Sequence, residues 1–268
     1  MKRLAVAAVV ALGGLAGACA AQAPSSMQAT ATTPTGFLDA TVLQALVDAV
    51  PPPPVEGSPA AVADAAGSQR MRTLEDTDRW TLAIRHAELR PTIAISHFDC
   101  LLGTRLTPEQ APSLIALLDR VLIDANAAAE LGKARAFRSR PVGDDPDRRS
   151  CQVVSAAGRA SASYPSGSAS VGAAYGEVIA ALAPDRAAEA REMGRQIGIS
   201  RLVCGMHYPS DVEAGRALGE AVVRAEAAAP GYQASMAAAR ADLDRARAAG
   251  LSSPACAAER LALAAPLP

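Results

Sequence analysis

The chain has 268 residues, of which half are hydrophobic, and its 26 basic and 27 acidic side chains nearly cancel. The length fits one or two domains, and the balanced charge excludes a general nucleic-acid binder or a polybasic membrane binder. Much of the hydrophobic fraction is alanine, whereas aromatic residues make up only 3% of the chain. Because alanine favours helix and strands favour aromatic and β-branched residues, the composition predicts an all-α protein rather than a β-sandwich.

Residues 1–20 have the features of an export signal. Two basic residues precede an uncharged apolar run that is too short to span a bilayer. Residues 15–19 resemble a lipobox, which would leave Cys19 as a lipid-modified N-terminus, whereas 18–20 also fit an ordinary signal-peptidase site. The sequence does not decide between these two sites. Both predict a periplasmic protein, and the first predicts a lipoprotein anchored to the outer membrane.

Residues 21–68 are rich in Pro, Ser, Thr, Ala and Gly, and Pro51 to Pro54 stand in a row. Such a composition cannot bury enough surface to fold alone. We therefore expect an extended N-terminal arm. Within it, the short apolar run between Phe37 and Val47 is expected to dock onto the body of the protein.

Beyond the arm, apolar residues recur at helical spacing, and no run alternates as in a strand. A Thr107-Pro108-Glu109 start signal precedes the first clear helix. The pattern predicts one helical domain over 69–250, followed by a C-terminal tail over 251–268. The expected helices cover 107–122, 171–182, 185–203, 210–223 and 233–249.

Four cysteines remain after removal of the leader: Cys100, Cys151, Cys204 and Cys256. An even number of cysteines in an exported protein indicates disulfides, and four cysteines allow three pairings. The cysteines contain no C-x-x-C motif and the three histidines are scattered. A structural zinc site is therefore not expected.

Three polar segments interrupt the alanine-rich pattern. The first runs from Lys133 to Arg140 and Pro141, and its lysine and arginine can present two cations to one anion. Taken alone, this segment is more simply interpreted as a solvated basic stretch. The second segment is Ser163-Tyr-Pro-Ser-Gly-Ser168, directly before a predicted helix.

The second segment can bind phosphate, because backbone N–H groups point outward at a helix start and Gly167 lets a ligand come close. Taken alone, it also fits an ordinary helix start capped by Ser168 or Ser170.

The third segment contains Arg201, His207 and Asp211. The histidine and the aspartate are four residues apart. On a helical turn the carboxylate can therefore hold one imidazole nitrogen and leave the other as nucleophile or base. Arg201 is expected beside the same pocket. A lone His–Asp pair is more often a surface pair or a hydrogen-bonded pair without a catalytic role. The three segments in this order nevertheless favour one oxyanion site.

The pattern K-x6-R-P, P-S-G and S-R-x5-H-x3-D resembles the type 2 phosphatidic acid phosphatase and vanadium haloperoxidase superfamily. The flanking residues look like those of bacterial class A non-specific acid phosphatases, and the resemblance runs from about residue 37 to 247. It implies a single-domain helical bundle and an exported, metal-independent acid phosphatase without a cofactor, acting on organic phosphomonoesters. It also implies a disulfide between Cys100 and Cys151.

The resemblance implies a role for each matching residue. His207 would attack phosphorus to form a phosphohistidine, and Asp211 would orient its imidazole. The phosphoryl oxygens would be bound by Lys133, Arg140, Ser166, the Gly167 backbone and Arg201.

One position departs from the family pattern. The second family motif ends in a histidine that protonates the leaving group, and here Ser168 stands in its place. A serine hydroxyl does not titrate near neutral pH, and general acid catalysis contributes about 10²–10⁴-fold. We therefore expect low turnover, with a smaller loss for good leaving groups such as aryl phosphates. His86 and His97 are the other imidazoles that could substitute, although packing is the simpler interpretation of both.

Three other functions fit the same residues. The chain could be a non-catalytic protein that binds phosphate or phosphoesters, an oxidoreductase that holds vanadate in this pocket, or a structural lipoprotein. Hydrolysis of p-nitrophenyl phosphate separates a phosphatase from a binding protein, and bromide oxidation with added vanadate tests the oxidoreductase. The sequence leaves open whether the chain forms a homo-oligomer.

Overall fold

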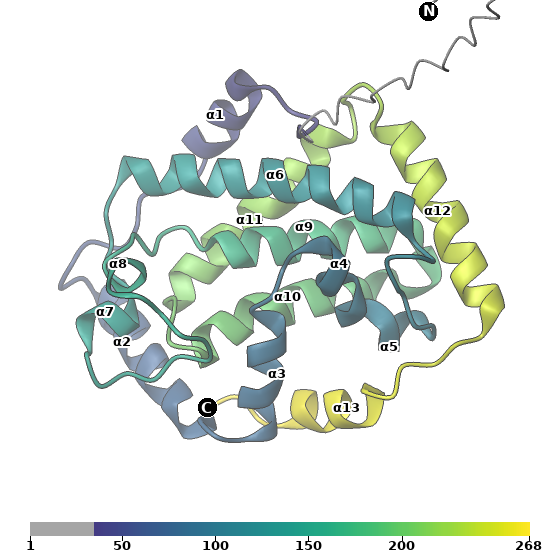
Figure 1. Cartoon of the computed structure of the whole chain (residues 1–268). Helices are drawn as coiled ribbons and strands as arrows, with labels where there is room; N and C mark the ends of the chain where they lie inside the picture. Colours follow the sequence, from purple (N-terminus) through teal and green to yellow (C-terminus); the bar gives the residue numbers. More distant parts are fainter. Residues whose placement is uncertain (1–34) are drawn as a thin grey trace, which may run out of the picture. The chain divides into compact units, whose positions relative to one another are not determined.

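A computed structural model describes residues 35–268 of the chain (Figure 1). The predicted leader over 1–20, with Cys19, lies outside these residues, as does the first part of the predicted arm. Between Thr35 and Pro268 the regular structure is helical and contains no strand, which confirms the all-α fold. In the same part of the chain, no helix is long and apolar enough to cross a membrane.

Short connections join the helices. The α-helices are α1 (Ala40–Asp48), α2 (Pro59–Arg70), α3 (Asp78–His86), α4 (Pro91–Ala94), α5 (Asp99–Leu102), α6 (Pro112–Arg135), α7 (Pro141–Asp144), α8 (Ala156–Arg159), α9 (Gly167–Leu182), α10 (Ala187–Val203), α11 (Pro209–Glu226), α12 (Tyr232–Ala249) and α13 (Cys256–Ala264). Short 3₁₀ helices form at η1 (Met71–Leu74), η2 (Ile95–Phe98) and η3 (Pro184–Arg186).

Helix α9 lies between α6 and α10, and it packs against α6, α10 and α11 (Figure 1). Small and apolar residues occupy most of its circumference, as expected for a helix that is buried on nearly all sides. Its residues Tyr175, Val178 and Ile179 are fully buried and share the main core with Leu117 and Leu118 of α6.

Glycines let α9 approach its neighbours closely. A Cβ on Gly194 of α10 would lie 2.6 Å from the carbonyl oxygen of Gly172. A Cβ on Gly215 of α11 would lie 2.2 Å from the carbonyl oxygen of Ser166. Neither distance leaves room for a side chain, so both glycines are needed at these crossings. The start of α9 is thereby held directly against α11.

Helices α9 to α12 lie where the apolar spacing predicts them. Helix α6 differs, because it begins at Pro112 rather than at the predicted start signal. The carboxylate of Asp242 in α12 accepts hydrogen bonds from the amides of Ser113 (2.5 Å) and Leu114 (3.1 Å). A distant helix therefore supplies the N-terminal cap that the local sequence lacks.

The extended arm predicted over 21–68 is wrong for the part that the structure describes. That part contains α1, capped by Asp39, and α2, capped by Ser58. Leu43 and Val47 are buried in the main core, so the expected docking of this apolar run is confirmed. The composition misled the prediction because α2, although weakly apolar, is stabilised by packing against η1 and α11.

The first described residues are held against α6. The Asp124 carboxylate accepts hydrogen bonds from the amides of Phe37 (2.6 Å) and Leu38 (3.1 Å). The guanidinium of Arg120 lies 3.6 Å from the centroid of the Phe37 ring, which packs against the Tyr232 ring in a T-shaped arrangement. This segment is therefore fixed by charge and by aromatic packing together.

Two disulfides join distant parts of the chain, Cys100–Cys256 and Cys151–Cys204. The predicted pairing of Cys100 with Cys151 is wrong. Cys256 begins α13, which packs against α3, so the expected tail over 251–268 contains a docked helix. Cys151 instead lies beside the end of α10, where its Cα is 4.8 Å from that of Cys204.

Candidate active site

The three polar segments meet at a cavity of about 390 Å³, bounded by α6, the start of α9 and the end of α10. Six of the predicted site residues line it: Lys133, Arg140, Gly167, Ser168, Arg201 and His207. Ser166 and Asp211 are fully buried and do not belong to the lining. The rest of the wall consists of Ala87, Glu88, Leu89, Arg90, Leu122, Asn126, Gln152, Val171 and Met206.

His207 precedes the first turn of α11 and is almost completely buried. Its Nδ1 lies 2.9 Å from the carbonyl oxygen of Ser163, and its Nε2 lies 3.1 Å from Nη1 of Arg140. A carbonyl oxygen can only accept, so Nδ1 carries the proton. The lone pair on Nε2 is therefore directed toward the cavity side, where the arginine lies.

Asp211 is connected to His207 less directly than the spacing predicts. Its Oδ2 lies 3.7 Å from Nδ1 of the imidazole, beyond hydrogen-bond distance. The hydroxyl of Ser163 lies between them, donating to Oδ2 at 2.6 Å and approaching Nδ1 to 3.3 Å. The same carboxylate accepts from the amide of Tyr208 (2.8 Å) at the start of α11, which fixes its rotamer.

Burial dominates the charge state of His207, whereas polar contacts outweigh burial for Asp211. Burial lowers the pKa of His207 to about 4, with a further contribution from Arg140 and Arg201 that Asp211 opposes. Burial alone would raise the pKa of Asp211, but its contacts with His207, Arg138 and Ser163 lower it overall. At neutral pH the site thus contains a neutral imidazole beside a carboxylate.

Arg140 is held rigidly by backbone and side-chain acceptors. Its guanidinium donates to the hydroxyl of Ser161 (2.9 Å) and to the carbonyl oxygens of Ala162 (2.9 Å) and Met206 (3.0 Å), as well as to His207. Burial lowers the pKa of this guanidinium, which nevertheless remains charged at any physiological pH.

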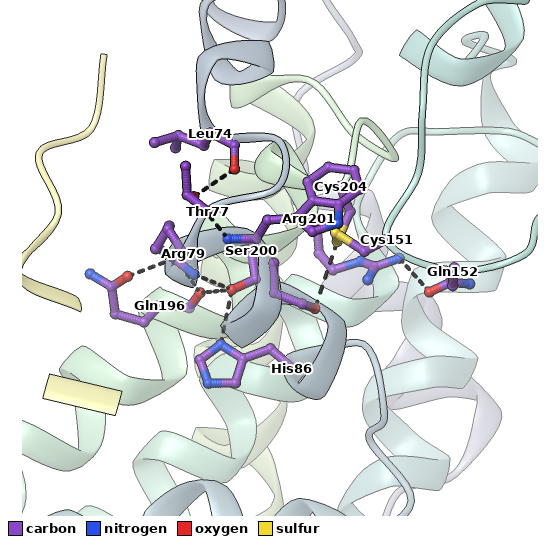
Figure 2. Close-up of a disulfide and its surroundings, with 12 residues drawn as sticks. Leu74, Thr77, Arg79, His86, Cys151, Gln152, Gln196, Ser200, Arg201 and Cys204 are labelled. Atoms are coloured by element: carbon purple, nitrogen blue, oxygen red, sulfur yellow. Dashed lines mark hydrogen bonds between the residues drawn. A yellow bond between two sulfur atoms is a disulfide. The ribbon is translucent and has the colours of Figure 1, made fainter. Parts of the chain in front are cut away.

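Arg201 has the most unused donors in the site. Its Nη2 donates to the amide oxygen of Gln152 at 3.2 Å (Figure 2). Its buried Nε and Nη1 have no hydrogen-bond partner among residues 35–268. Burial, followed by the charge of Arg140, lowers the pKa of Arg201 to about 10. Two adjacent, desolvated guanidiniums of this kind favour binding of an anion.

The disulfide beside Arg201 positions its one partner. Figure 2 shows Cys151 bonded to Cys204 at the end of α10, with Gln152 following directly in the chain. The Cys151–Cys204 bond therefore holds Gln152 where its amide oxygen meets the guanidinium of Arg201.

Lys133 projects from α6 on the same face as Asn126, two turns earlier. Its Nζ pairs with Glu130 at 2.6 Å and would lie 3.7 Å from a Cβ placed on Gly167. The amides of Gly167 and Ser168 belong to the first turn of α9, where no intrahelical acceptor exists. An ammonium and two amides thus border the same part of the cavity.

The two serines of the second segment have different positions. Ser166, rather than the expected Ser168 or Ser170, is the N-cap of α9, and its hydroxyl accepts from the amide of Ala169 at 3.2 Å. The hydroxyl of Ser166 is therefore used within the protein. Ser168 is partly exposed, lines the cavity and makes no side-chain hydrogen bond to any residue in 35–268.

Neither of the two other imidazoles reaches the cavity. His86 is buried and its Nδ1 meets the hydroxyl of Ser200, which also accepts from Arg79 at 2.9 Å (Figure 2). His97 contacts the carbonyl oxygen of Glu88 through Nε2. Both side chains are buried and neither lines the cavity, so neither is placed to act as the general acid that the resemblance implies at position 168.

Sequence reasoning missed four residues of the site: Ser163, Arg138, Gln152 and Asn126. Ser163 and Arg138 lie inside the recognised segments, but nothing in the pattern separates them from their neighbours. Between residues 35 and 268, no group of three or more His, Cys, Asp or Glu side chains could hold a metal ion. The described groups suit a tetrahedral oxyanion, which cations and amides surround while a neutral imidazole faces it.

Comparison with known proteins identifies a family and several relatives of the chain. Residues 115–234 match the model of the PAP2 superfamily. The chain is 33% identical over 199 residues to an acid phosphatase of Zymomonas mobilis, covering 73% of this chain and 74% of that protein. It is 29% identical to a non-specific acid phosphatase of Providencia stuartii (69% and 75% covered) and 28% identical to one of Salmonella typhimurium (73% and 78%).

Among solved structures, the chain resembles a transmembrane PAP2-type phosphatidylglycerolphosphate phosphatase from Bacillus subtilis. That likeness has a TM-score of 0.47 at 20% identity and covers 70% of this chain and 91% of the other. The assignment to a family rests on the relatives found by sequence. The chain belongs to the PAP2 superfamily, in the group of the acid phosphatases related to the class A enzymes.

Proposed function

We propose that the protein is an exported acid phosphatase that hydrolyses organic phosphomonoesters through a phosphohistidine on His207. The observation that carries the proposal is the contact between Nε2 of His207 and Arg140 at 3.1 Å, in a cavity that Lys133 and Arg201 also line. A substrate phosphoryl group held by these three cations has its phosphorus next to the neutral imidazole.

The first chemical step follows from the protonation states. Nε2 attacks phosphorus, the bond to the leaving oxygen breaks, and the imidazole becomes a cation that Asp211 and Ser163 stabilise. Water then attacks the phosphohistidine and releases inorganic phosphate, returning His207 to its neutral form. Lys133, Arg140 and Arg201 neutralise the charge on the transferring oxygens in both steps.

Protonation of the leaving oxygen is the weak point of this scheme. The cavity lining near the start of α9 offers Ser168 and Asn126, and neither side chain titrates near neutral pH. The leaving group must then depart as an anion or take its proton from solvent. We therefore propose that turnover is reduced, most of all for alkyl phosphates.

Export is part of the proposal. Lys2 and Arg3, together with the apolar run that follows them, support a signal peptide. Two disulfides among the described residues support an oxidising compartment such as the periplasm. Whether Cys19 becomes acylated is tested by metabolic labelling with a fatty acid, using Cys19→Ala as the control.

Hydrolysis of p-nitrophenyl phosphate by the purified protein tests the function. We expect measurable turnover that His207→Ala abolishes and Ser168→His raises, and an acid-labile phosphoenzyme that the His207 variant lacks. The matched control is His97→Gln, which changes a buried imidazole outside the cavity. Absence of turnover in all variants, combined with thermal stabilisation of the protein by inorganic phosphate, would identify a non-catalytic phosphate-binding protein instead.

A further inference from the structure

A buried carboxylate outside the recognised motifs, that of Asp64, is connected to the site by hydrogen bonds. Asp64 lies on α2, far upstream of residues 115–234 that match the family model, and is 5% exposed. Its Oδ1 accepts from the amide of Ser210 at 3.0 Å, in the first turn of α11. Its Oδ2 accepts from the Ser210 hydroxyl and from Nη2 of Arg138 at 2.7 Å.

Arg138 is clamped between two carboxylates. While Nη2 binds Asp64, Nη1 donates to Oδ1 of Asp211 (2.6 Å) and to the hydroxyl of Ser210 (2.7 Å). Its guanidinium carbon also lies 4.4 Å from the centroid of the Tyr208 ring. Although burial alone would lower the pKa of Arg138, the carboxylates of Asp211 and Asp64 raise it. Arg138 is therefore a fixed cation that holds one oxygen of Asp211.

A single chain of buried and partly buried contacts thus runs from α2 to His207. It passes from Asp64 through Arg138 to Asp211, and from there through the Ser163 hydroxyl to Nδ1 of His207. We propose that Asp64 is a positioning residue for His207, acting through Arg138. The effect on turnover rests on the proposed phosphatase function, whereas the effect on the imidazole does not.

The physical reason is the geometry of the clamp. Without the Asp64 carboxylate, Nη2 of the partly buried Arg138 loses its acceptor, and the guanidinium must move toward another one or toward water. Oδ1 of Asp211 then loses its fixed partner, and the carboxylate that holds Ser163 can rotate. Asp64 makes no hydrogen bond to Lys133, Arg140 or Arg201, so anion binding is expected to persist.

The kinetic test compares Asp64→Asn with Asp242→Asn. Asp242 is an equivalent control, because it is buried, accepts from the amides at the start of α6 and pairs with Arg245, all outside the cavity. For Asp64→Asn we expect kcat per folded enzyme on p-nitrophenyl phosphate to fall about tenfold or more, since small misplacements of reacting groups cost up to about 10². The inhibition constant of inorganic phosphate should stay within about threefold.

A double-mutant cycle tests the route through Arg138. If Asp64 acts through this side chain, Asp64→Asn adds no further loss of kcat to Arg138→Gln. Equal kcat losses per folded enzyme in Asp64→Asn and Asp242→Asn would show that the loss of any buried carboxylate has this effect, and would overturn the proposal. So would additive losses in the cycle.

An NMR measurement keeps the proposal testable even if the wild-type protein has no turnover. The chain has three histidines, so the imidazole signals of His207 can be assigned by their loss in His207→Ala. We expect Asp64→Asn, but not Asp242→Asn, to shift the His207 ring resonances and the pH at which they titrate. Unchanged His207 signals in a folded Asp64→Asn protein would refute the positioning role, independently of whether the protein hydrolyses phosphomonoesters.

Discussion

The two sides of the cavity differ in how completely they are built. On the side of the proposed nucleophile, His207 has a partner at each nitrogen, Asp211 has three kinds of donor, and Arg140 is fixed by carbonyl oxygens. On the side of the leaving group, Ser168 makes no side-chain contact of this kind within residues 35–268. In the proposed mechanism, anion binding and attack therefore depend on a preorganised framework, whereas protonation of the leaving group has no dedicated side chain.

The largest expected effect comes from disturbing the nucleophile side. Arg140→Lys keeps the charge but cannot reproduce a fork that reaches His207 and two carbonyl oxygens. We expect kcat/KM for p-nitrophenyl phosphate to fall about 10²–10³-fold, as when an oxyanion-binding donor is lost. Arg240→Lys is the matched control, because Arg240 also donates to carbonyl oxygens, those of Ala181 and Leu182, away from the cavity. Similar losses in both variants would contradict the comparison.

An imidazole placed at position 168 tests whether the leaving-group side lacks a general acid. Ser168→His should raise the hydrolysis of alkyl phosphates by about 10²-fold and that of aryl phosphates less, because only poor leaving groups need a general acid. Rates measured over a series of phosphomonoesters should therefore depend less steeply on leaving-group pKa in the variant. Ser168→Ala should behave like the wild type. A large loss in Ser168→Ala would show that the serine already takes part in proton transfer.

The next smaller effects are expected from removing the two disulfides one at a time. Replacing Cys151 and Cys204 by alanine frees Gln152, so we expect a several-fold higher KM through Arg201 and a loss of up to about 4 kcal/mol in stability. Replacing Cys100 and Cys256 opens a longer loop, for which the entropic model gives up to about 5 kcal/mol, with KM unchanged in the folded protein. Steady-state kinetics and urea unfolding of both variants check this. An equal KM in the two would contradict the positional role of Gln152.

The smallest effect concerns pH. Burial lowers the pKa of His207 to about 4 and also lowers those of His86 and His97. Unfolded imidazoles titrate near pH 6.5, so the unfolded state binds more protons below that pH, and the free energy of unfolding falls as the pH drops from about 6.5 toward 4. His207 contributes at most about 3 kcal/mol to this loss.

Urea unfolding at several pH values measures the slope. In His207→Asn, which cannot titrate in this range, the free energy of unfolding should fall less steeply with acidification. The same slope in both proteins would mean that the imidazole is not buried in its neutral form.

Much of the candidate site could be predicted from the sequence because its motifs are local. The cations of the first segment, the Pro-Ser-Gly start of α9 and the spacing of His207 from Asp211 each depend on neighbouring residues. The helices α9 to α12 were predicted from their apolar spacing for the same reason. The close crossings of α9 with α10 and α11 depend instead on glycines, which the apolar spacing did not single out.

What the sequence did not reveal depends on contacts between distant segments. Asp64 stands in a Pro/Ala-rich stretch, and its role exists only because α2 packs beside α11. The bridging hydroxyl of Ser163 replaces a direct His–Asp contact, because His207 precedes the helix on which Asp211 lies. Cysteine pairing likewise follows from where α13 and the Cys151 loop fold, which spacing does not encode.

The Cys100–Cys256 bond has a further consequence for how the protein responds to proteolysis. The Cys100–Cys256 bond closes a span of 156 residues into a ring. All six predicted site residues that line the cavity, from Lys133 to His207, lie within this ring. A single backbone cut inside the ring opens it without separating the fragments. A nicked molecule then keeps all of these groups on one covalent frame, and electrophoresis separates the fragments only under reducing conditions.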